Sequence, residues 1–256
     1  TLKEVYLNHR ELFANDPHDK FPLLVKINEI QEPCSVQVHP DDAYARRYEN
    51  DYGKAEFCLW LDVEEGTKII CGHSAKTKEE FRKAVEEKDW DTLFIRKPIH
   101  TNEFVYTPAG TVHGIEGKLM MAEVQQSSDV TYRIYDYDRK EADGNMRELH
   151  IDQAIEVTNI PHIEPDVHPI VTMLEGNEVI EYVNEKYFSV TRYKIQNEIQ
   201  INNPSYSLCL SLSGNGILHI DETDYDIQAG IGFIVTSHTK RYFIKGNIDL
   251  LVSVPK

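Results

Sequence analysis

The first half of the sequence contains polar residues of the types that bind metal ions. In the segment Ser-Val-Gln-Val-His at 35–39, a strand period of two places Ser35, Gln37 and His39 on one face and both valines on the other. This alternation fits a strand that lines a polar cavity. A strand with one face at the solvent-exposed edge of a sheet would show the same pattern.

Two further motifs carry a carboxylate and a second histidine. Lys54 and Glu56 share a face at the start of an apolar run, and His113 follows a Pro-x-Gly turn at 108–110. Taken singly, a lysine beside a glutamate is more often a solvated ion pair. A single histidine after a turn is more often structural or exposed.

Together these motifs predict a metal site. His39, Glu56 and His113 lie on three different expected strands, with Gln37 beside the first. Two imidazoles, a carboxylate and an amide oxygen suit a divalent ion such as zinc and leave a position for water or substrate. The spacing is not that of two ligands on one helix, so only a folded barrel would bring them together.

An arginine near the end of this region adds a candidate anion contact. Arg133 alternates with apolar and aromatic residues in the segment 130–139. Its guanidinium is always charged, and the chain as a whole carries a net charge of −16, which repels anions. Arg133 and Lys54 are therefore the local cations that an anionic substrate would need. The alternative is an arginine neutralised by neighbouring aspartates.

The elements that must position these residues are mainly strands. In the first half we expect strands at 22–30, 34–39, 56–63, 67–72, 103–107, 119–125 and 130–137. Capping boxes at Thr1 and Glu4 and at Thr77 and Glu80 predict helices, the first of them reaching Leu12. Further short helices are expected at 41–48 and 149–157.

A proline-rich segment at 161–169 divides the chain. Beyond it we expect strands at 179–183, 187–195, 207–213, 216–220, 232–236 and 250–254, with a turn at Gly214-Asn215-Gly216. Two strand-rich halves, 1–160 and 161–256, suggest a pair of β-sandwich or barrel modules.

Composition excludes several classes of protein. The 256 residues are enough to bury roughly 70–75% of the unfolded surface without disulfides. The acidic balance argues against partners such as nucleic acid or anionic membranes. No apolar run approaches a membrane span, and no signal-peptide core is present. The four cysteines form no C-x-x-C pair, so we expect buried, reduced thiols and a cytoplasmic protein.

Four motifs in order resemble type I mannose-6-phosphate isomerases, most of all the short bacterial form, over about residues 1–162. They are the segments 37–42 (QVHPDD), 53–56 (GKAE), 108–113 (PAGTVH) and 131–138 (TYRIYDYD). The resemblance implies a mainly β, bicupin fold with a few short helices, in which the first module is catalytic. It implies a zinc-dependent aldose–ketose isomerase that interconverts mannose 6-phosphate and fructose 6-phosphate.

The same resemblance assigns roles to residues. His39, Glu56 and His113 would bind one Zn²⁺ per chain, with Gln37 a fourth ligand in many members. Arg133 would be catalytic, and Ser35 and Lys54 would line the pocket of the sugar-phosphate substrate. The group that transfers the proton stays open among Lys54, Glu123, His113 and metal-bound water.

Two differences from the family shape the remaining expectations. Family members begin with several dozen residues, including strands, before the point that matches Thr1, so a sheet edge of the catalytic barrel would be exposed or replaced. In the second half, His219 and His238 lack a paired ligand motif and are expected to be structural. The alternatives to the isomerase are a non-catalytic sugar-phosphate-binding cupin, a metal-dependent cupin oxygenase, and an isomerase that prefers another aldose.

Overall fold

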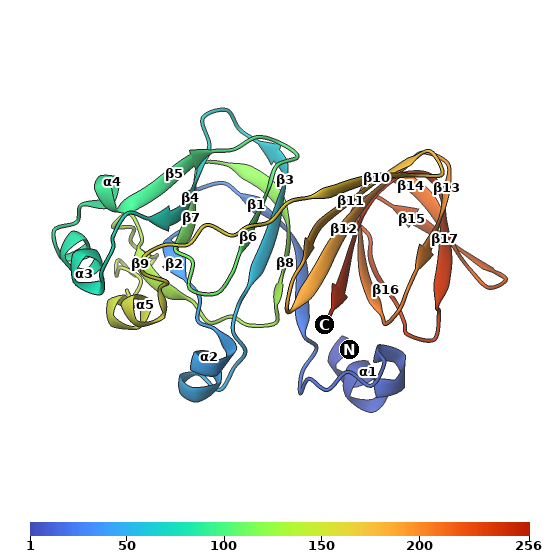
Figure 1. Cartoon of the computed structure of the whole chain (residues 1–256), viewed down its shortest axis with the longest axis horizontal. Helices are drawn as coiled ribbons and strands as arrows, with labels where there is room; N and C mark the ends of the chain where they lie inside the picture. The colour runs from blue at the N-terminus through green and yellow to red at the C-terminus, as the bar shows by residue number, and fades with distance from the viewer. The chain divides into compact units, whose positions relative to one another are not determined.

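The computed structural model describes residues 1–256, which group into two compact units (Figure 1). The central unit is Lys26–Asp166, and the terminal unit combines Thr1–Val25 with Val167–Lys256. The first 25 residues, expected in the module 1–160, are thus grouped with the second half of the chain. Most of the ordered elements are short antiparallel strands, which confirms the expected mainly β fold with a few short helices.

The helix at the start of the chain explains this grouping. α1 (Leu2–Asn8) begins with the predicted capping box, in which Thr1 and Glu4 cap each other. It ends earlier than expected, and the chain continues as a 3₁₀ turn, η1 (Arg10–Phe13). The Phe13 ring packs edge-on against Tyr206, which belongs to the second half of the chain. This aromatic contact attaches the segment to the terminal unit.

The central unit contains two antiparallel sheets. The strands are β1 (Leu23–Ile30), β2 (Val36–Val38), β3 (Glu56–Val63), β4 (Lys68–His73), β5 (Phe94–Pro98), β6 (Phe104–Thr107), β7 (His113–Glu116), β8 (Leu119–Gln126) and β9 (Tyr132–Tyr135). One sheet has the order β1-β8-β3-β6, and the other has the order β5-β4-β7-β2-β9. Apolar side chains of both sheets, among them Trp60 and Ile115, meet in one buried cluster. The core of this unit therefore lies between the sheets.

Four helices interrupt these strands. They are α2 (Asp42–Tyr48), α3 (Lys78–Glu86), α4 (Trp90–Leu93) and α5 (Ile151–Val157). Asp41 caps α2 and Thr77 caps α3 through side-chain bonds to the backbone, and the cap at Thr77 is the one that the capping-box pattern predicts. α3 buries Phe81 and Val85 against the second sheet, while its charged residues face outward.

The terminal unit is a single antiparallel sheet of eight strands. The strands are β10 (Ile170–Leu174), β11 (Asn177–Asn184), β12 (Phe188–Ile195), β13 (Glu198–Asn202), β14 (Ser207–Ile220), β15 (Thr223–Gln228), β16 (Gly232–Val235) and β17 (Arg241–Pro255). The main path is β10-β11-β12-β17-β14-β15, with β13 on β17 and β16 on β14. The long strands β14 and β17 pair with several partners, so the sheet curves around its own apolar core.

The predicted turn at Gly214-Asn215-Gly216 is wrong. β14 continues through these residues, and its pairing with β17 only shifts register between Ser211 and Ser213. Gly214 has φ +78°, and a Cβ there would lie 2.1 Å from the carbonyl oxygen of Asn247. The glycine therefore allows a β-bulge and a close backbone approach inside one strand rather than a hairpin between two.

No helix has both the length and the apolar character needed to cross a membrane.

Candidate metal centre

Strand register brings the candidate ligands of the central unit to one place. Gln37 of β2 lies directly opposite His113 of β7 on one side and Arg133 of β9 on the other. Directly opposed residues of antiparallel strands point to the same face. The side chains of Gln37, His113 and Arg133 therefore share one face of the five-stranded sheet.

His39, Glu56 and His113 form the cluster that the sequence predicts. One ligand atom from each lies within 4.8 Å of the others, and His39 and Glu56 are buried. The two oxygens of Glu56 divide between the histidines, with Oε1 3.4 Å from His39 Nε2 and Oε2 3.3 Å from His113 Nε2. The cluster joins the two sheets, because Glu56 belongs to β3 of the other sheet.

Backbone carbonyls orient both imidazoles. His39 Nδ1 donates to the carbonyl of Val130 at 2.8 Å, and His113 Nδ1 donates to the carbonyl of Thr111 at 2.9 Å. With the proton held on Nδ1, each Nε2 presents its lone pair to the cluster. His39 Nε2 is buried and has no hydrogen-bond partner. An orphaned buried acceptor of this kind is what a metal ion would satisfy.

The protonation states also suit a metal. Burial lowers the pKa of His39 to about 4, so its imidazole is neutral near pH 7. Burial alone would raise the pKa of Glu56, but His39, His113 and Lys54 outweigh it and hold that pKa well below its usual range. Neutral imidazoles and an ionised carboxylate are the forms that coordinate metals. The residues present therefore fit a divalent ion.

Gln37 and Ser35 lie beside this cluster. The amide nitrogen of Gln37 is 3.4 Å from His113 Nε2, and its oxygen accepts a bond from Ser35 Oγ at 3.3 Å. A half turn of the amide would exchange nitrogen and oxygen and present the oxygen to the cluster. Gln37 is therefore within reach as a fourth ligand.

Lys54 contacts the carboxylate of the cluster. Its Nζ is 3.1 Å from Glu56 Oε1, and the side chain is almost fully buried. Gly53 allows this placement, because a Cβ there would lie 2.5 Å from the backbone nitrogen of Asp42. The chain thus passes against the start of α2, and the Lys54 backbone nitrogen donates to the Pro40 carbonyl at 3.1 Å.

Arg133 reaches the same face of the sheet without binding the cluster. Its Nη1 donates to the carbonyl of Glu148 at 2.9 Å, and its Nε is buried without a hydrogen-bond partner. Burial, followed by the charge of Arg147, lowers the pKa of the guanidinium from its usual value. Neighbouring aspartates were the alternative partners of Arg133, and one of them, Asp136, is instead paired with Arg139 and Arg147. Arg133 therefore offers an anionic group the charge of its guanidinium rather than the buried Nε–H.

Lys26 and Asn28 also belong to this region, although no sequence motif pointed to them. Glu123, one of the open candidates for proton transfer, is buried and accepts from Lys26 Nζ at 2.7 Å and from Asn28 Nδ2 at 2.7 Å. Lys26 Nζ also donates to Gln125 Oε1 at 2.5 Å. Lys26 and Asn28 are two residues apart on β1, so the strand period would have placed them on one face.

A cavity of about 90 Å³ opens between the sheets beside the cluster. It is lined by Gln37, Glu56, His113 and Glu123 at its polar side and by apolar residues such as Trp60 elsewhere. Cys34, Cys58 and Cys71 also line it, and all four cysteines of the chain are free thiols, as expected. Burial raises the pKa of the Cys58 thiol, which keeps it protonated.

Two protein-family models match the chain. Residues 1–66 match the catalytic domain of phosphomannose isomerase type I. Residues 178–255 match the cupin domain of mannose-6-phosphate isomerase.

Curated relatives match along the whole chain. A probable mannose-6-phosphate isomerase of Bacillus subtilis, GmuF, is 40% identical over 259 residues, covering 100% of this chain and 82% of the relative. The mannose-6-phosphate isomerase of Streptococcus mutans is 38% identical and covers 98% of this chain and 80% of its own length.

Solved structures show the same fold. The crystal structure of the mannose 6-phosphate isomerase from Bacillus subtilis superposes with a TM-score of 0.96 at 34% identity, over 99% of this chain and 82% of that one. A putative mannosephosphate isomerase from Archaeoglobus fulgidus, 18% identical with a TM-score of 0.76, shares the fold over 99% of this chain and 79% of that one.

Proposed function

The chain belongs to the type I mannose-6-phosphate isomerase family, and on that basis we propose that it interconverts mannose 6-phosphate and fructose 6-phosphate at a bound zinc ion. The observation that carries the proposal is the buried cluster of His39, Glu56 and His113 with its unpartnered His39 Nε2. The cavity beside the cluster has Gln37, Glu56, His113 and Glu123 on its polar side, so a group that enters it would meet the cluster directly.

One Zn²⁺ per chain would be held by His39 Nε2, His113 Nε2 and the carboxylate of Glu56. The amide oxygen of Gln37 would complete the set after a half turn. Zinc favours nitrogen and oxygen ligands of these kinds, and a catalytic zinc commonly keeps one position open. When bound, the ion would act as a Lewis acid toward the sugar oxygens.

The charges around the cluster support an anionic substrate. Lys54 lies next to Glu56, and Arg133 faces the same side of the sheet as Gln37. Arg139 and Arg147 share the single carboxylate of Asp136, so this group of three side chains carries a net positive charge. In a chain with a net charge of −16, such a local excess would be needed to hold a sugar phosphate. Ser35, which donates to Gln37, would contact the substrate at the pocket wall.

The reaction requires a proton to move between C2 and C1 through an enediol. The positive charge of the Arg133 guanidinium would stabilise the negative charge that develops on the enediol oxygens. His113 is unsuited to carry the proton, since both ring nitrogens are engaged by the Thr111 carbonyl and the cluster. Lys54 and Glu123 are the side chains that would hold or move it.

A direct test is to incubate the chain, supplied with zinc, with mannose 6-phosphate and to follow the products by NMR. We expect conversion to fructose 6-phosphate, with loss of conversion in Glu56→Gln, which keeps the size of the side chain and removes its charge. Glu64→Gln, an exposed acidic position beyond the end of β3, is the matched control and is expected to retain activity. Binding of mannose 6-phosphate without product would instead support a non-catalytic sugar-phosphate-binding protein.

A further inference from the structure

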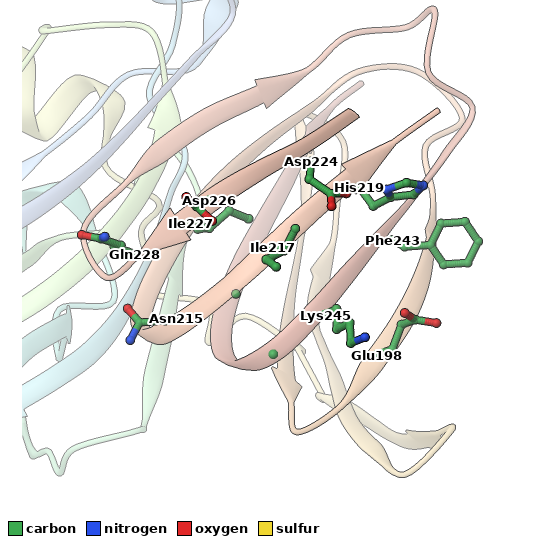
Figure 2. A pocket seen from close by; sticks show the side chains of 12 residues that line it. Glu198, Asn215, Ile217, His219, Asp224, Asp226, Ile227, Gln228, Phe243 and Lys245 are labelled. Atoms are coloured by element: carbon green, nitrogen blue, oxygen red, sulfur yellow. Dashed lines mark hydrogen bonds and ion pairs between the residues drawn. The ribbon is translucent and has the colours of Figure 1, made fainter. Parts of the chain in front are cut away.

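The outer face of the terminal sheet carries a large open hollow. It measures about 1010 Å³ and lies over strands β13, β17, β14 and β15 (Figure 2). Alternate residues of these strands, such as Leu218 and Ile244, are buried in the core on the other face. The side chains that line the hollow are therefore those left on the solvent side by the strand period of two.

Strand register orders these side chains into two rows across the sheet. In the first row, Phe243 pairs with His219, and His219 pairs with Asp224. His219 Nδ1 is 2.6 Å from Asp224 Oδ1, and Figure 2 shows the two side chains pointing toward one another. The ring of Phe243 is half-buried, with its centroid 6.4 Å from that of His219. The row thus places an aromatic ring next to a fixed polar pair.

The second row mixes both signs of charge. Lys245 pairs with Glu198 on one side and with Ile217 on the other, and Ile217 pairs with Asp226. At the end of the hollow, the amides of Asn215 and Gln228 are cross-strand partners. The hollow therefore offers hydrogen-bond donors and acceptors on both sides of the apolar side chain of Ile217.

This arrangement discriminates between classes of ligand. Three carboxylates, those of Glu198, Asp224 and Asp226, would repel an anion such as a second sugar phosphate. These carboxylates are also poorly placed to hold a cation together, because Lys245 lies opposite Glu198 in the strand register and His219 already bonds Asp224. A neutral ligand rich in hydroxyl groups meets neither penalty, and each of its hydroxyls can both donate and accept a hydrogen bond.

We propose that this outer face binds a neutral oligosaccharide. The C–H face of a sugar ring would pack on Phe243, while carboxylate and amide groups would bind its hydroxyls. The open shape suits a chain of several sugar rings rather than a single enclosed one. The residues involved all belong to the terminal unit, whereas the metal cluster belongs to the central unit, so the two sites use separate parts of the chain.

The test is to titrate the 256-residue chain with mannotetraose, cellotetraose and maltotetraose at millimolar concentrations, observed by NMR. We expect saturable binding of at least one of them. Phe243→Ala should weaken it roughly tenfold, because the aromatic contact is lost. Asp226→Asn should weaken it by a smaller factor, because one strong acceptor is removed.

Tyr225→Ala is the matched control, because this exposed tyrosine lies on β15 between Asp224 and Asp226 and points to the opposite face. It should bind as the parent chain does. Phe243→Leu, which keeps an apolar side chain, separates loss of the ring from loss of folding, and should weaken binding while melting like the parent. No binding of any tetrasaccharide would overturn the proposal. So would binding that is unchanged in Phe243→Ala, or binding of spermine in their place.

Discussion

His39 and His113 show how single residues of this chain are prepared for a metal. Each imidazole donates from Nδ1 to a backbone carbonyl, and the two carbonyls belong to Val130 and Thr111, just before β9 and β7. The orientation of the rings is therefore set by the fold itself and does not depend on the ion. His113 is the more exposed of the two, so replacing it should disturb the fold less than replacing His39.

We expect His113→Ala to lose most of the bound zinc, because the site would keep one imidazole and one carboxylate as its strong ligands. The measurement is zinc per chain by elemental analysis after dialysis. His219→Ala, which removes a histidine from the terminal unit, should keep the zinc of the parent. Full metal occupancy in His113→Ala would refute the ligand role of this residue.

Arg133 is expected to act on the substrate rather than on the metal, because it contacts the Glu148 carbonyl and not the cluster. Arg133→Ala should therefore keep its zinc and lose turnover roughly 100-fold or more, the scale seen when an oxyanion contact is removed. Arg82→Ala, on the exposed side of α3, serves as the control. A near-normal rate in Arg133→Ala would rule out its assignment.

Most residues of the site could be predicted, because the sequence pattern around each of them already indicates a strand with a polar face. His39, Gln37 and Ser35 follow the strand period within a few positions, and Glu56 begins an apolar strand. Lys26 could not be found in this way, because its partners Glu123 and Gln125 lie almost a hundred positions away. Only the pairing of β1 with β8 brings these groups together.

At the scale of elements, capping residues predicted correctly where helices begin, whereas two glycines predicted a turn that the structure does not have. Thr1, Asp41 and Thr77 each cap the predicted helix. The glycines at 214 and 216, in contrast, predict a turn but lie in the middle of β14. A sequence-local signal cannot distinguish a hairpin turn from a bulge, because both need a glycine with positive φ.

The sequence did not predict strands β5, β10, β13 and β15, and for β13 and β15 the reason is again that pairing rather than local pattern places them. β13 and β15 carry polar residues on the face that lines the hollow of the terminal sheet. They show few apolar residues in a row and so resemble loops in sequence. Their positions are determined by pairing, β13 with β17 and β15 with β14. The sequence of a single strand carries no information about such pairing.

The bulge can be tested by comparing two glycines of positive φ. At Gly176 a Cβ would meet nothing within 4 Å, whereas at Gly214 it would meet the Asn247 carbonyl. Gly176→Ala should therefore lower the free energy of unfolding by about 1–2 kcal/mol, the cost of the left-handed backbone alone. Gly214→Ala should lower it by roughly 2 kcal/mol more, because β14 and β17 must also move apart. Equal urea midpoints for the two variants would contradict the bulge.

At the scale of the whole molecule, the two units differ in what they contribute. The central unit holds the metal cluster and the cations around it, and the terminal unit holds the open hollow over β13, β17, β14 and β15. The central unit ends at Asp166, whereas the sequence places the boundary at residue 160, and the division into two modules stays a prediction. The sequence alone could not show that Thr1–Val25 joins the second half, because this depends on the contact between Phe13 and Tyr206.

The net charge of −16 disfavours the binding of an anionic substrate. An acidic protein repels a sugar phosphate at long range, and this repulsion weakens as salt screens it. Lys54, Arg133 and the arginine pair at Asp136 must overcome it close to the site. Localisation in the cytoplasm stays a prediction, as do the roles of the individual site residues.

The most direct test of the account is to remove metal from the chain with a chelator and to measure mannose 6-phosphate conversion before and after zinc is restored. We expect the metal-free protein to be folded but inactive, and one equivalent of zinc per chain to restore formation of fructose 6-phosphate. Conversion that persists without metal would contradict the role of the cluster. A folded chain that takes up zinc at His39, Glu56 and His113 and still forms no product would contradict the proposed isomerase.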